Sequence, residues 1–370
     1  MNKKNILDSI DMLFDKQKKL ADIESLKLDN RFNAINFDIL YSCDFGMENW
    51  DWPQGVGLYG LNKFNVEQKT DKFSDFLIEW FNSKDIKNEV KNINTCSPMY
   101  TLTKIDKSDV YKEDVIEWCE YLMNELPKTD EKCFQHVTSN FTNDGVNLNE
   151  DQIWIDTLFM SLLFLNEAGI KYDINRYKEE ARYQLLQHIK YLYCKETKLF
   201  YHGYNFEEKS NYGRIHWCRG NSWFTCGMVD FLEQAEEGNK NDPIFRYILE
   251  LLKNQVEALM MLQGKEGLWN TVLLDEGSYI ETSGSAAILA AILKGIRLGY
   301  LPESYKEPCL HGIESLITYI DYDGALLNTS VGTGIGNDKE FYNNIAIAPM
   351  AYGQSLAIIA LSESLNHLEG

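Results

Sequence analysis

Apolar residues recur with a helical period along the whole chain, and one kind of predicted helix is polar on one face only. In 176–193, for example, Tyr177, Ala181 and Leu185 fall on one face while Lys178 falls on another. A helix with one polar face belongs at the outside of a protein. The segments of this kind are 6–21, 72–82, 114–126, 175–193, 243–263 and 305–320.

A second kind of predicted helix has few charges and many small residues. Because it is apolar nearly all round, such a helix must be surrounded by other elements. The segments of this kind are 54–61, 95–103, 154–165, 220–232, 283–293 and 350–361.

The two kinds of helix alternate along the chain, which predicts the fold class. A ring of inner helices inside a ring of outer helices buries every segment of the second kind. We therefore predict an all-α fold, an (α/α)6 barrel with inner and outer helices in equal number. The chain has only seven Pro and no low-complexity linker, so we expect residues 1–370 to form a single domain.

Each predicted inner helix begins with polar or aromatic residues. If the inner helices run parallel, these N-terminal ends meet at one mouth, where the helix dipoles create a positive potential. The segments that would meet there are 50–54, 92–95, 152–156, 216–223, 278–283 and 348–354.

Asp156 is the first candidate for chemistry, because it lies near the start of a buried helix and two residues after Trp154. Capping of that helix is the structural alternative, since Asp is favoured in a first helical turn. Asp151 is also available as a cap. The residues alone leave both interpretations of Asp156 open.

Arg219 is the second candidate, because Trp217 and Trp223 bracket it at the start of another buried helix. A guanidinium there can bind a carboxylate, and indole rings can stack on a sugar. A stacked, purely structural Arg is the alternative. Glu281 supplies either a second carboxylate at the mouth or a helix N-terminal charge.

The formal charge of −20, from 36 basic and 56 acidic residues, argues against a partner that is nucleic acid or an anionic membrane. An anionic substrate would have to be met by local cations. The six His are dispersed and the eight Cys form no zinc-type spacing, so we expect no metal and no cofactor. No apolar run suits a signal peptide or a bilayer span, so we expect a cytoplasmic protein.

Two glycine motifs suggest nucleotide binding at first sight. The segment 55–60 matches G-x-G-x-x-G, but no strand precedes it, so close helix packing is the better interpretation. Gly332, Gly334 and Gly336 lie in V-G-T-G-I-G-N-D, with no G-K-[ST] after it, which favours a rim loop over a phosphate loop.

Taken together, these stretches resemble the unsaturated glucuronyl and rhamnogalacturonyl hydrolases of glycoside hydrolase families 88 and 105, and family 105 more closely. The resemblance runs from about Trp50 to Glu363. It rests on W-D-W-P-Q-G-V-G-L-Y-G, W-I-D-T-L-F-M, Y-H-G-Y, W-C-R-G-N-S-W, E-T-S-G-S-A and Y-G-Q. The family fold is an (α/α)6 barrel, in agreement with the helix alternation.

The resemblance implies a hydrolase that removes a 4,5-unsaturated uronic acid, galacturonyl or glucuronyl, from lyase-generated oligosaccharides. Such an enzyme hydrates the C4=C5 double bond. Asp156 matches the family's catalytic carboxylate and would act as general acid and base. We expect a pocket walled by Trp154 and Trp217 to raise its pKa.

The resemblance also implies substrate-binding residues. His202, Trp217, Arg219 and Trp223 match family positions, as do Trp52 and Gln54, and Arg219 would meet the uronate carboxylate. Asn94 stands where many relatives carry Asp, so it can bind a sugar hydroxyl but cannot act as a base. The remaining expected contacts are His136, Trp154 and Tyr352.

Two other functions remain open at this stage. A conventional inverting or retaining glycosidase would need two carboxylates, which Asp156 and Glu281 would supply. A non-catalytic carbohydrate-binding barrel would need none. The residues predict no oligomeric state.

Overall fold

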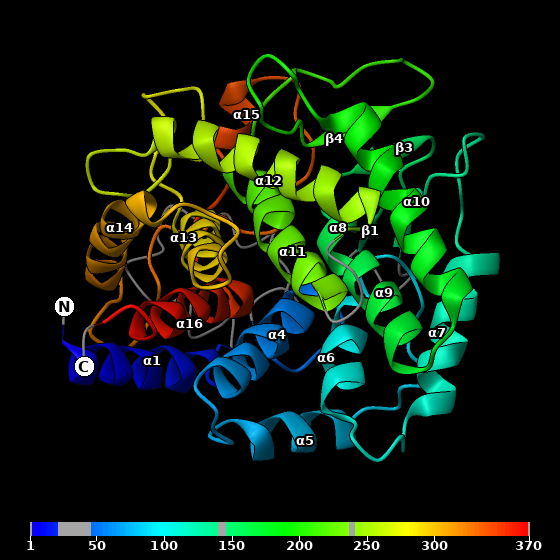
Figure 1. Ribbon diagram of the computed structural model, residues 1–370, viewed down its shortest axis with the longest axis horizontal. Coiled ribbons are helices and arrows are strands. Elements are labelled where there is room, and N and C mark those ends of the chain that lie inside the picture. Colours follow the sequence, from blue (N-terminus) through cyan, green and yellow to red (C-terminus); the bar gives the residue numbers. More distant parts are fainter. Residues whose placement is uncertain (1, 21–45, 140–145, 237–240, 369–370) are drawn as a thin grey trace.

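In the computed structural model of the protein, residues 2–20, 46–139, 146–236 and 241–368 are described. Every predicted helix is present within them (Figure 1). The inner helices are α4 (Trp52–Glu67), α6 (Ser97–Ile105), α8 and α9 (Thr157–Met160 and Leu162–Lys171), α11 (Cys218–Glu236), α13 (Thr282–Arg297) and α16 (Ala351–Leu365). The outer helices are α1 (Lys3–Gln17), α5 (Ser74–Asn82), α7 (Lys112–Asn124), α10 (Asn175–Leu192), α12 (Pro243–Leu262) and α14 (Lys306–Thr318).

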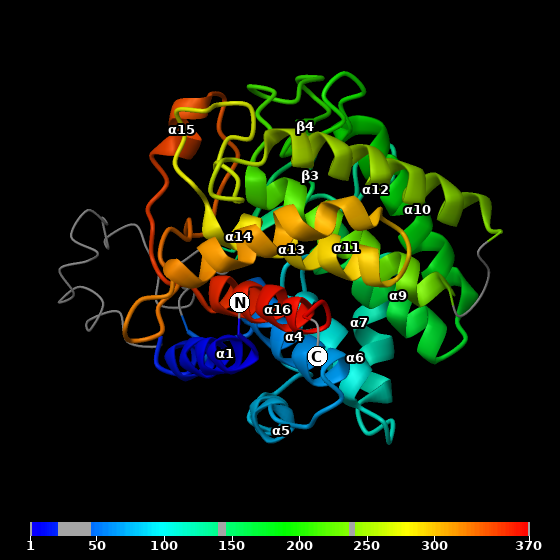
Figure 2. The ribbon, with the colours of Figure 1, turned by 60° about the vertical axis from the view of Figure 1, so that its left-hand side comes forward.

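The inner helices form a closed ring. Helix α4 packs on α6, α6 on α9, the α8–α9 pair on α11, α11 on α13, α13 on α16, and α16 on α4. Outer helices cover this ring, with α1 lying alongside α16 and α12 alongside α11 (Figure 1 and Figure 2). The prediction of an (α/α)6 barrel is confirmed.

Burial explains why the two kinds of helix take these places. Every residue of α13 from Thr282 to Ile296 is buried, whereas α10 buries only one face, through side chains such as Tyr177 and Leu185. Glycines let the inner helices approach closely. A Cβ on Gly60 would lie 2.6 Å from Cβ of Ser355 on α16, so the prediction that 55–60 packs helices is confirmed.

Inner helix three differs from its predicted form. It begins at Thr157, after a strand, and it breaks at Ser161 into α8 and α9. The strand, β3 (Gln152–Trp154), pairs antiparallel with β4 (Gly203–Asn205), so that Trp154 faces Gly203. These residues look like a helix start in sequence, but their hydrogen bonds go to a segment some fifty positions away.

The remaining elements are short. Strand β1 (Val137–Ser139) pairs antiparallel with β2 (Val146–Leu148). A 3₁₀ turn (Glu303–Tyr305) precedes α14, and a small helix, α15 (Lys339–Asn343), precedes α16. The first outer helix ends at Gln17, and residue 21, its predicted end, lies outside the described residues. None of the helices in the described ranges is long and apolar enough to cross a bilayer.

A buried group of charges, which the sequence pattern did not predict, joins the C-terminal ends of the inner helices. Lys294 of α13 lies 2.9 Å from Asp230, 2.6 Å from Glu233 and 3.3 Å from Glu67, measured from Nζ to carboxylate oxygens. Lys63 of α4 also binds Asp230, at 2.7 Å. Burial raises the pKa of Asp230, but the charges of Lys294 and Lys63 outweigh it and hold that pKa well below its ordinary value.

Replacing Lys294 by Met should lower the free energy of unfolding by about 3–5 kcal/mol, because Asp230 and Glu67 stay buried and each loses a cationic partner. Urea denaturation at neutral pH measures the change. Lys190→Met is the matched control, since Lys190 pairs with Glu131 at the surface and should matter little. Equal effects in both variants would contradict a structural role for the buried charges.

Candidate active site

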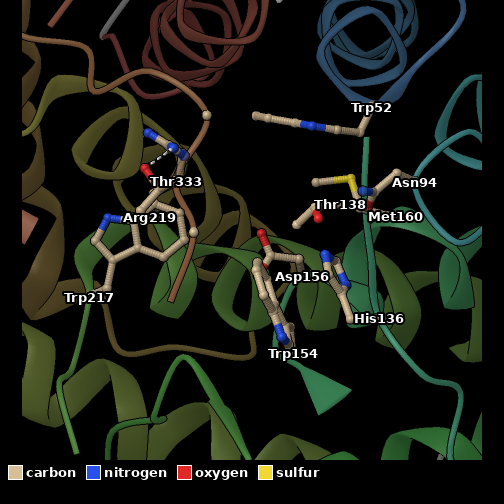
Figure 3. A pocket seen from close by; sticks show the side chains of 12 residues that line it. Trp52, Asn94, His136, Thr138, Trp154, Asp156, Met160, Trp217, Arg219 and Thr333 are labelled. Carbon is tan, nitrogen blue, oxygen red and sulfur yellow. Dashed lines mark hydrogen bonds between the residues drawn. The ribbon is translucent and has the colours of Figure 1, made fainter. Parts of the chain in front are cut away.

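A cavity of about 170 Å³ opens where the N-terminal ends of the inner helices meet (Figure 3). Sites for drug-sized ligands span about 300–1,000 Å³, so this cavity suits a single sugar ring. Its lining residues are Trp52, Asn94, His136, Thr138, Trp154, Asp156, Met160, Trp217, Arg219, Gly332, Thr333 and Gly334.

Asp156 immediately precedes α8, yet its side chain makes no capping hydrogen bond. Its Oδ1 instead accepts a hydrogen bond from Nε1 of Trp223 at 3.1 Å. Its Oδ2 lies 3.4 Å from Nε2 of His202. The β3–β4 pairing creates this neighbourhood, because the N–H of Ile155 donates to the carbonyl of His202 at 2.9 Å. The capping interpretation of Asp156 is therefore wrong.

Asp151 does not cap the helix either. It has a positive φ of 53° in the turn before β3, and its carbonyl accepts a hydrogen bond from the N–H of Phe206. Asp tolerates this left-handed conformation better than most residues. Asp151 therefore shapes the turn that leads into the strand.

The expected rise in the pKa of Asp156 is wrong in direction. Burial does raise that pKa, but the nearby ring nitrogen of His202 and the charge of Arg219 outweigh burial and lower the pKa of Asp156 below its ordinary value. The indoles of Trp154 and Trp217 line the cavity as expected. The polar groups that oppose the effect of burial come from other elements of the fold. Asp156 is therefore ionised at neutral pH.

His136 stacks on Trp154, with ring centroids 4.1 Å apart and planes within 9°. Burial lowers the pKa of His136 to about 3, so its ring is neutral at neutral pH. The stacked pair forms a flat, uncharged wall beside Asp156 (Figure 3). Planar surfaces of this kind are suited to packing against a sugar ring.

Several buried polar atoms around the cavity lack a hydrogen-bond partner within the described residues. Such groups are rare in native proteins, and a cluster of them at a cavity indicates that a ligand or water completes their bonding. They are Nδ1 of His136, Nε1 of Trp217 and Nε of Arg219, together with Oδ2 of Asp156 and Nε2 of His202, which face each other at 3.4 Å, longer than an ordinary hydrogen bond.

Arg219 lines the cavity, but protein groups already bind both of its terminal nitrogens. Nη1 donates to the carbonyl of Ser330 at 2.8 Å, and Nη2 donates to the carbonyl of Val331 and to Oγ1 of Thr333, each at 2.9 Å. The guanidinium is stacked on Trp217, 4.5 Å from its ring centroid. The bonding of Arg219 is thus that of a stacked, structural arginine, the alternative named in the sequence analysis. Only its Nε is left to donate a hydrogen bond to a ligand.

Glu281 is not a second carboxylate of the cavity. It is fully buried and caps α13, where its Oε2 accepts the N–H of Gly284 at 2.6 Å. Its Oε1 accepts the hydroxyl of Ser283 at 2.6 Å and the N–H of Ser330 at 3.0 Å, and it lies 3.5 Å from Nη1 of Arg219. The prediction of a helix N-terminal charge is confirmed.

The other predicted residues fall into two groups. Trp52, Asn94, His136, Trp154 and Trp217 line the cavity, as expected. The remaining ones are not part of that lining: His202 and Trp223 contact Asp156, Gln54 donates to the carbonyl of Gly46 at 2.7 Å, and Tyr352 packs in a tilted arrangement on Trp52 with ring centroids 4.7 Å apart.

Some lining residues were not predicted. Met160 lies one helical turn after Asp156, a spacing that could have identified it. Thr138 carries no such signal, because it reaches the cavity from β1. The prediction of a rim loop at Gly332 and Gly334 is confirmed, although it did not include a place in the cavity lining. With Thr333 they belong to residues 331–338, which we call the rim loop. In the described part of the chain, no group of three or more His, Cys, Asp or Glu is placed to hold a metal ion.

Comparison with known proteins gives a consistent picture. Residues 35–368 match Glycosyl Hydrolase Family 88. The chain is 29% identical, over 88% of its length and 91% of the relative's, to the unsaturated rhamnogalacturonyl hydrolase YesR of Bacillus subtilis. It is similar in structure to a possible member of the GH105 family from Salmonella enterica, with a TM-score of 0.89, 31% identity and coverage of 99% and 95% of the two chains. A possible GH105 member from Klebsiella pneumoniae has a TM-score of 0.87 and 32% identity, with coverage of 99% of this chain and 94% of that chain.

Replacing His202 by Phe should raise the pKa of Asp156, because burial then acts with less opposition. A ¹³C NMR titration of the carboxyl carbon, assigned through Asp156→Asn, measures this. His216→Phe is the control, since His216 is buried but stacks on Tyr201. An unchanged or lower pKa in His202→Phe would contradict the electrostatic account.

Proposed function

The chain belongs to Glycosyl Hydrolase Family 88, and from this premise we propose that it removes a 4,5-unsaturated uronic acid from the non-reducing end of lyase-generated oligosaccharides. The observation that carries the proposal is Asp156, a partly buried, ionised carboxylate that faces Trp223 and His202 at a cavity the size of one sugar ring. The name of the relative YesR supports the same substrate class. We also propose that residues 1–370 form one domain, which the closed ring of inner helices supports.

Hydration of the C4=C5 double bond needs one proton at C4 and one hydroxide equivalent at C5. Asp156 would give the proton to C4, and the ring oxygen would stabilise the positive charge that develops at C5. Water would then add at C5 and return a proton to Asp156, so the enzyme ends unchanged and one water is consumed. The resulting hemiketal opens and releases the rest of the oligosaccharide.

Asp156 must hold a proton before it can donate one, although it is ionised in the free protein. Binding of the anionic substrate would raise the pKa of Asp156, because a like charge nearby and the loss of water both raise the pKa of a carboxyl group. The proton would be taken up together with the substrate. His202, whose Nε2 lies 3.4 Å away, would then bind the carboxylate again once the proton has left.

One carboxylate suffices for this reaction, and one is what the cavity offers. Among the described residues that line it, Asp156 is the only Asp or Glu. A conventional glycosidase needs a second carboxyl group about 5–10 Å away across the scissile bond. The hydrogen bonds of Glu281 serve α13, Ser330 and Arg219, which weighs against that alternative.

Binding of the substrate's carboxylate has local support despite the net charge of −20. The N-terminal ends of several inner helices point to the cavity, and Arg219 adds a full positive charge at its wall. Because the terminal nitrogens of Arg219 are already bound to residues 330–333, we propose that it acts through its charge and its Nε.

Asn94 would bind a sugar hydroxyl as an acceptor. Its Nδ2 donates to the carbonyl of Val137 at 2.9 Å, which fixes the amide and leaves Oδ1 to accept. The aromatic wall of Trp154 and His136 would pack against the ring, opposite Trp52 (Figure 3).

Replacing Asp156 by Asn should lower kcat by about 10²–10⁴-fold, the usual contribution of a general acid–base group. Loss of the ultraviolet absorbance of the unsaturated uronate measures turnover. Asp151→Asn is the matched control, because Asn also tolerates the positive φ at this position and Asp151 does not line the cavity. An Asp156→Asn enzyme with near wild-type turnover would refute the assignment.

Turnover in water that contains methanol separates the two hydrolytic routes. In the hydration route methanol can replace water at C5 and give a methyl ketal that keeps the rest of the oligosaccharide, whereas attack at the anomeric carbon leaves C5 without a methoxy group. NMR of the product distinguishes the two results. A non-catalytic binding barrel would give no product in either case.

Replacing Asn94 by Asp should move the pH dependence of kcat/KM to higher pH. A second carboxylate at the same cavity would raise the pKa of Asp156 through like-charge repulsion. A pH–rate profile of the variant beside wild type measures the shift, and Asn94→Ala controls for loss of the amide. A profile that stays in place would contradict the electrostatic coupling of the two positions.

A further inference from the structure

Tyr342 lies outside the cavity lining but contacts the residue next to Asp156. It belongs to α15, directly after the rim loop, and its side chain is fully buried. Its Oη lies 2.9 Å from Nδ1 of His202. The N–H of Gly336, in the rim loop, donates to the same oxygen at 3.3 Å. No pattern in the sequence pointed to this residue.

The hydrogen bonds around Tyr342 fix the position of the proton on His202. Since Oη already accepts the N–H of Gly336, its own proton needs an acceptor, and Nδ1 of His202 is the one that the described residues provide. Nδ1 is then unprotonated, and the neutral ring carries its hydrogen on Nε2. The opposite arrangement would leave the buried tyrosine proton without a partner and direct a lone pair at a carboxylate.

The other nitrogen of His202 faces the proposed catalytic group. Nε2 lies 3.4 Å from Oδ2 of Asp156, slightly longer than the about 2.7–3.2 Å of ordinary N–H···O bonds. Contacts of this kind tighten when substrate binds. Trp217 and Trp154 pack on the imidazole ring of His202, with centroids 4.5 and 5.2 Å away. These aromatic rings surround the imidazole, and Tyr342 provides the hydrogen bond to its Nδ1.

We propose that Tyr342 is a positioning residue: its hydroxyl holds His202 in the tautomer that presents Nε2–H to Asp156. This inference rests on the proposed role of Asp156. In this arrangement His202 cannot accept a proton from water on Nε2, so Asp156 alone serves as the base. Tyr342 also ties the rim loop, which lines the cavity, to the pair that performs the chemistry.

Several titratable groups surround this pair. His202 faces Asp156, Tyr342 and His136, while Arg219 acts on Asp156 and Tyr212 acts on Tyr342. Among them, Tyr342 is the one that bonds the far nitrogen of the ring. Loss of the Tyr342 hydroxyl therefore leaves the His202 ring less firmly held, with its Nε2–H less well directed at Asp156, and removes no charge.

Replacing Tyr342 by Phe keeps the buried ring and deletes only the hydroxyl. We expect kcat to fall about fivefold to tenfold, which corresponds to one hydrogen bond of ordinary strength. We also expect the alkaline limb of the kcat/KM profile, where the general acid loses its proton, to move to higher pH, because a weaker N–H donor lets burial raise the pKa of Asp156. An alkaline limb that stays in place would overturn the proposal.

NMR on the free wild-type enzyme tests the proton position without any substrate. With ¹⁵N-histidine labelling and assignment through His202→Gln, Nε2 of His202 should have the chemical shift of a protonated nitrogen and Nδ1 that of an unprotonated, hydrogen-bonded one. In Tyr342→Phe, Nδ1 should move towards the shift of an unbonded nitrogen. A proton on Nδ1 in the wild-type protein would overturn the proposal, even if the variant failed to fold.

Tyr177→Phe is the matched control, because Tyr177 is equally buried and its hydroxyl donates to Glu120 on an outer helix. It should destabilise the protein to a similar extent and leave the pH profile and the His202 shifts unchanged. The two proposals fail separately. An active Asp156→Asn enzyme would refute the catalytic assignment and leave the tautomer result standing, whereas a proton on Nδ1 would refute only the role of Tyr342.

Discussion

The direction of the inner helices is the constraint on which the rest of the structure depends. Their N-terminal ends meet around the cavity and their C-terminal ends meet at the opposite end of the barrel, so the two ends have opposite partial charge. Asp156 and Glu281 lie at the positive end, and Lys63, Lys294 and Arg297 lie at the negative end. The cavity is therefore suited to an anion in a protein with a net charge of −20.

That electrostatic setting also governs the state of Asp156. Apolar walls alone would keep a carboxyl protonated. Here His202 and Arg219 overcome the effect of burial, so the free protein holds a carboxylate. In the proposed mechanism an incoming uronate would partly cancel this positive potential, so that substrate binding and proton uptake by Asp156 would be the same event. A single carboxylate would then serve as acid and as base in succession.

The sequence predicted what depends on local pattern. Inner and outer helices differ in periodicity, and the first residues of the inner helices identified Trp52, Asn94, Asp156 and Trp217 at the cavity. It did not predict what depends on distant pairs. The direction of the pKa shift of Asp156 depends on His202, 46 positions along the chain. Tyr342 reaches His202 across 140 positions, a contact that periodicity cannot reveal.

The rim loop contacts both Arg219 and the residue behind His202. Its first residues, Val331 and Thr333, accept hydrogen bonds from Nη2 of Arg219, and the N–H of Gly336 in its last turn donates to Tyr342. The position of this loop is therefore linked to the position of the Arg219 guanidinium and, through Tyr342, to that of the His202 ring. A side chain on Gly203 would come within 2.2 Å of Ile335, so the absence of a side chain there lets the loop pack against β4. The strand pair that places Asp156 beside His202 therefore also packs against the loop that binds Nη2 of Arg219.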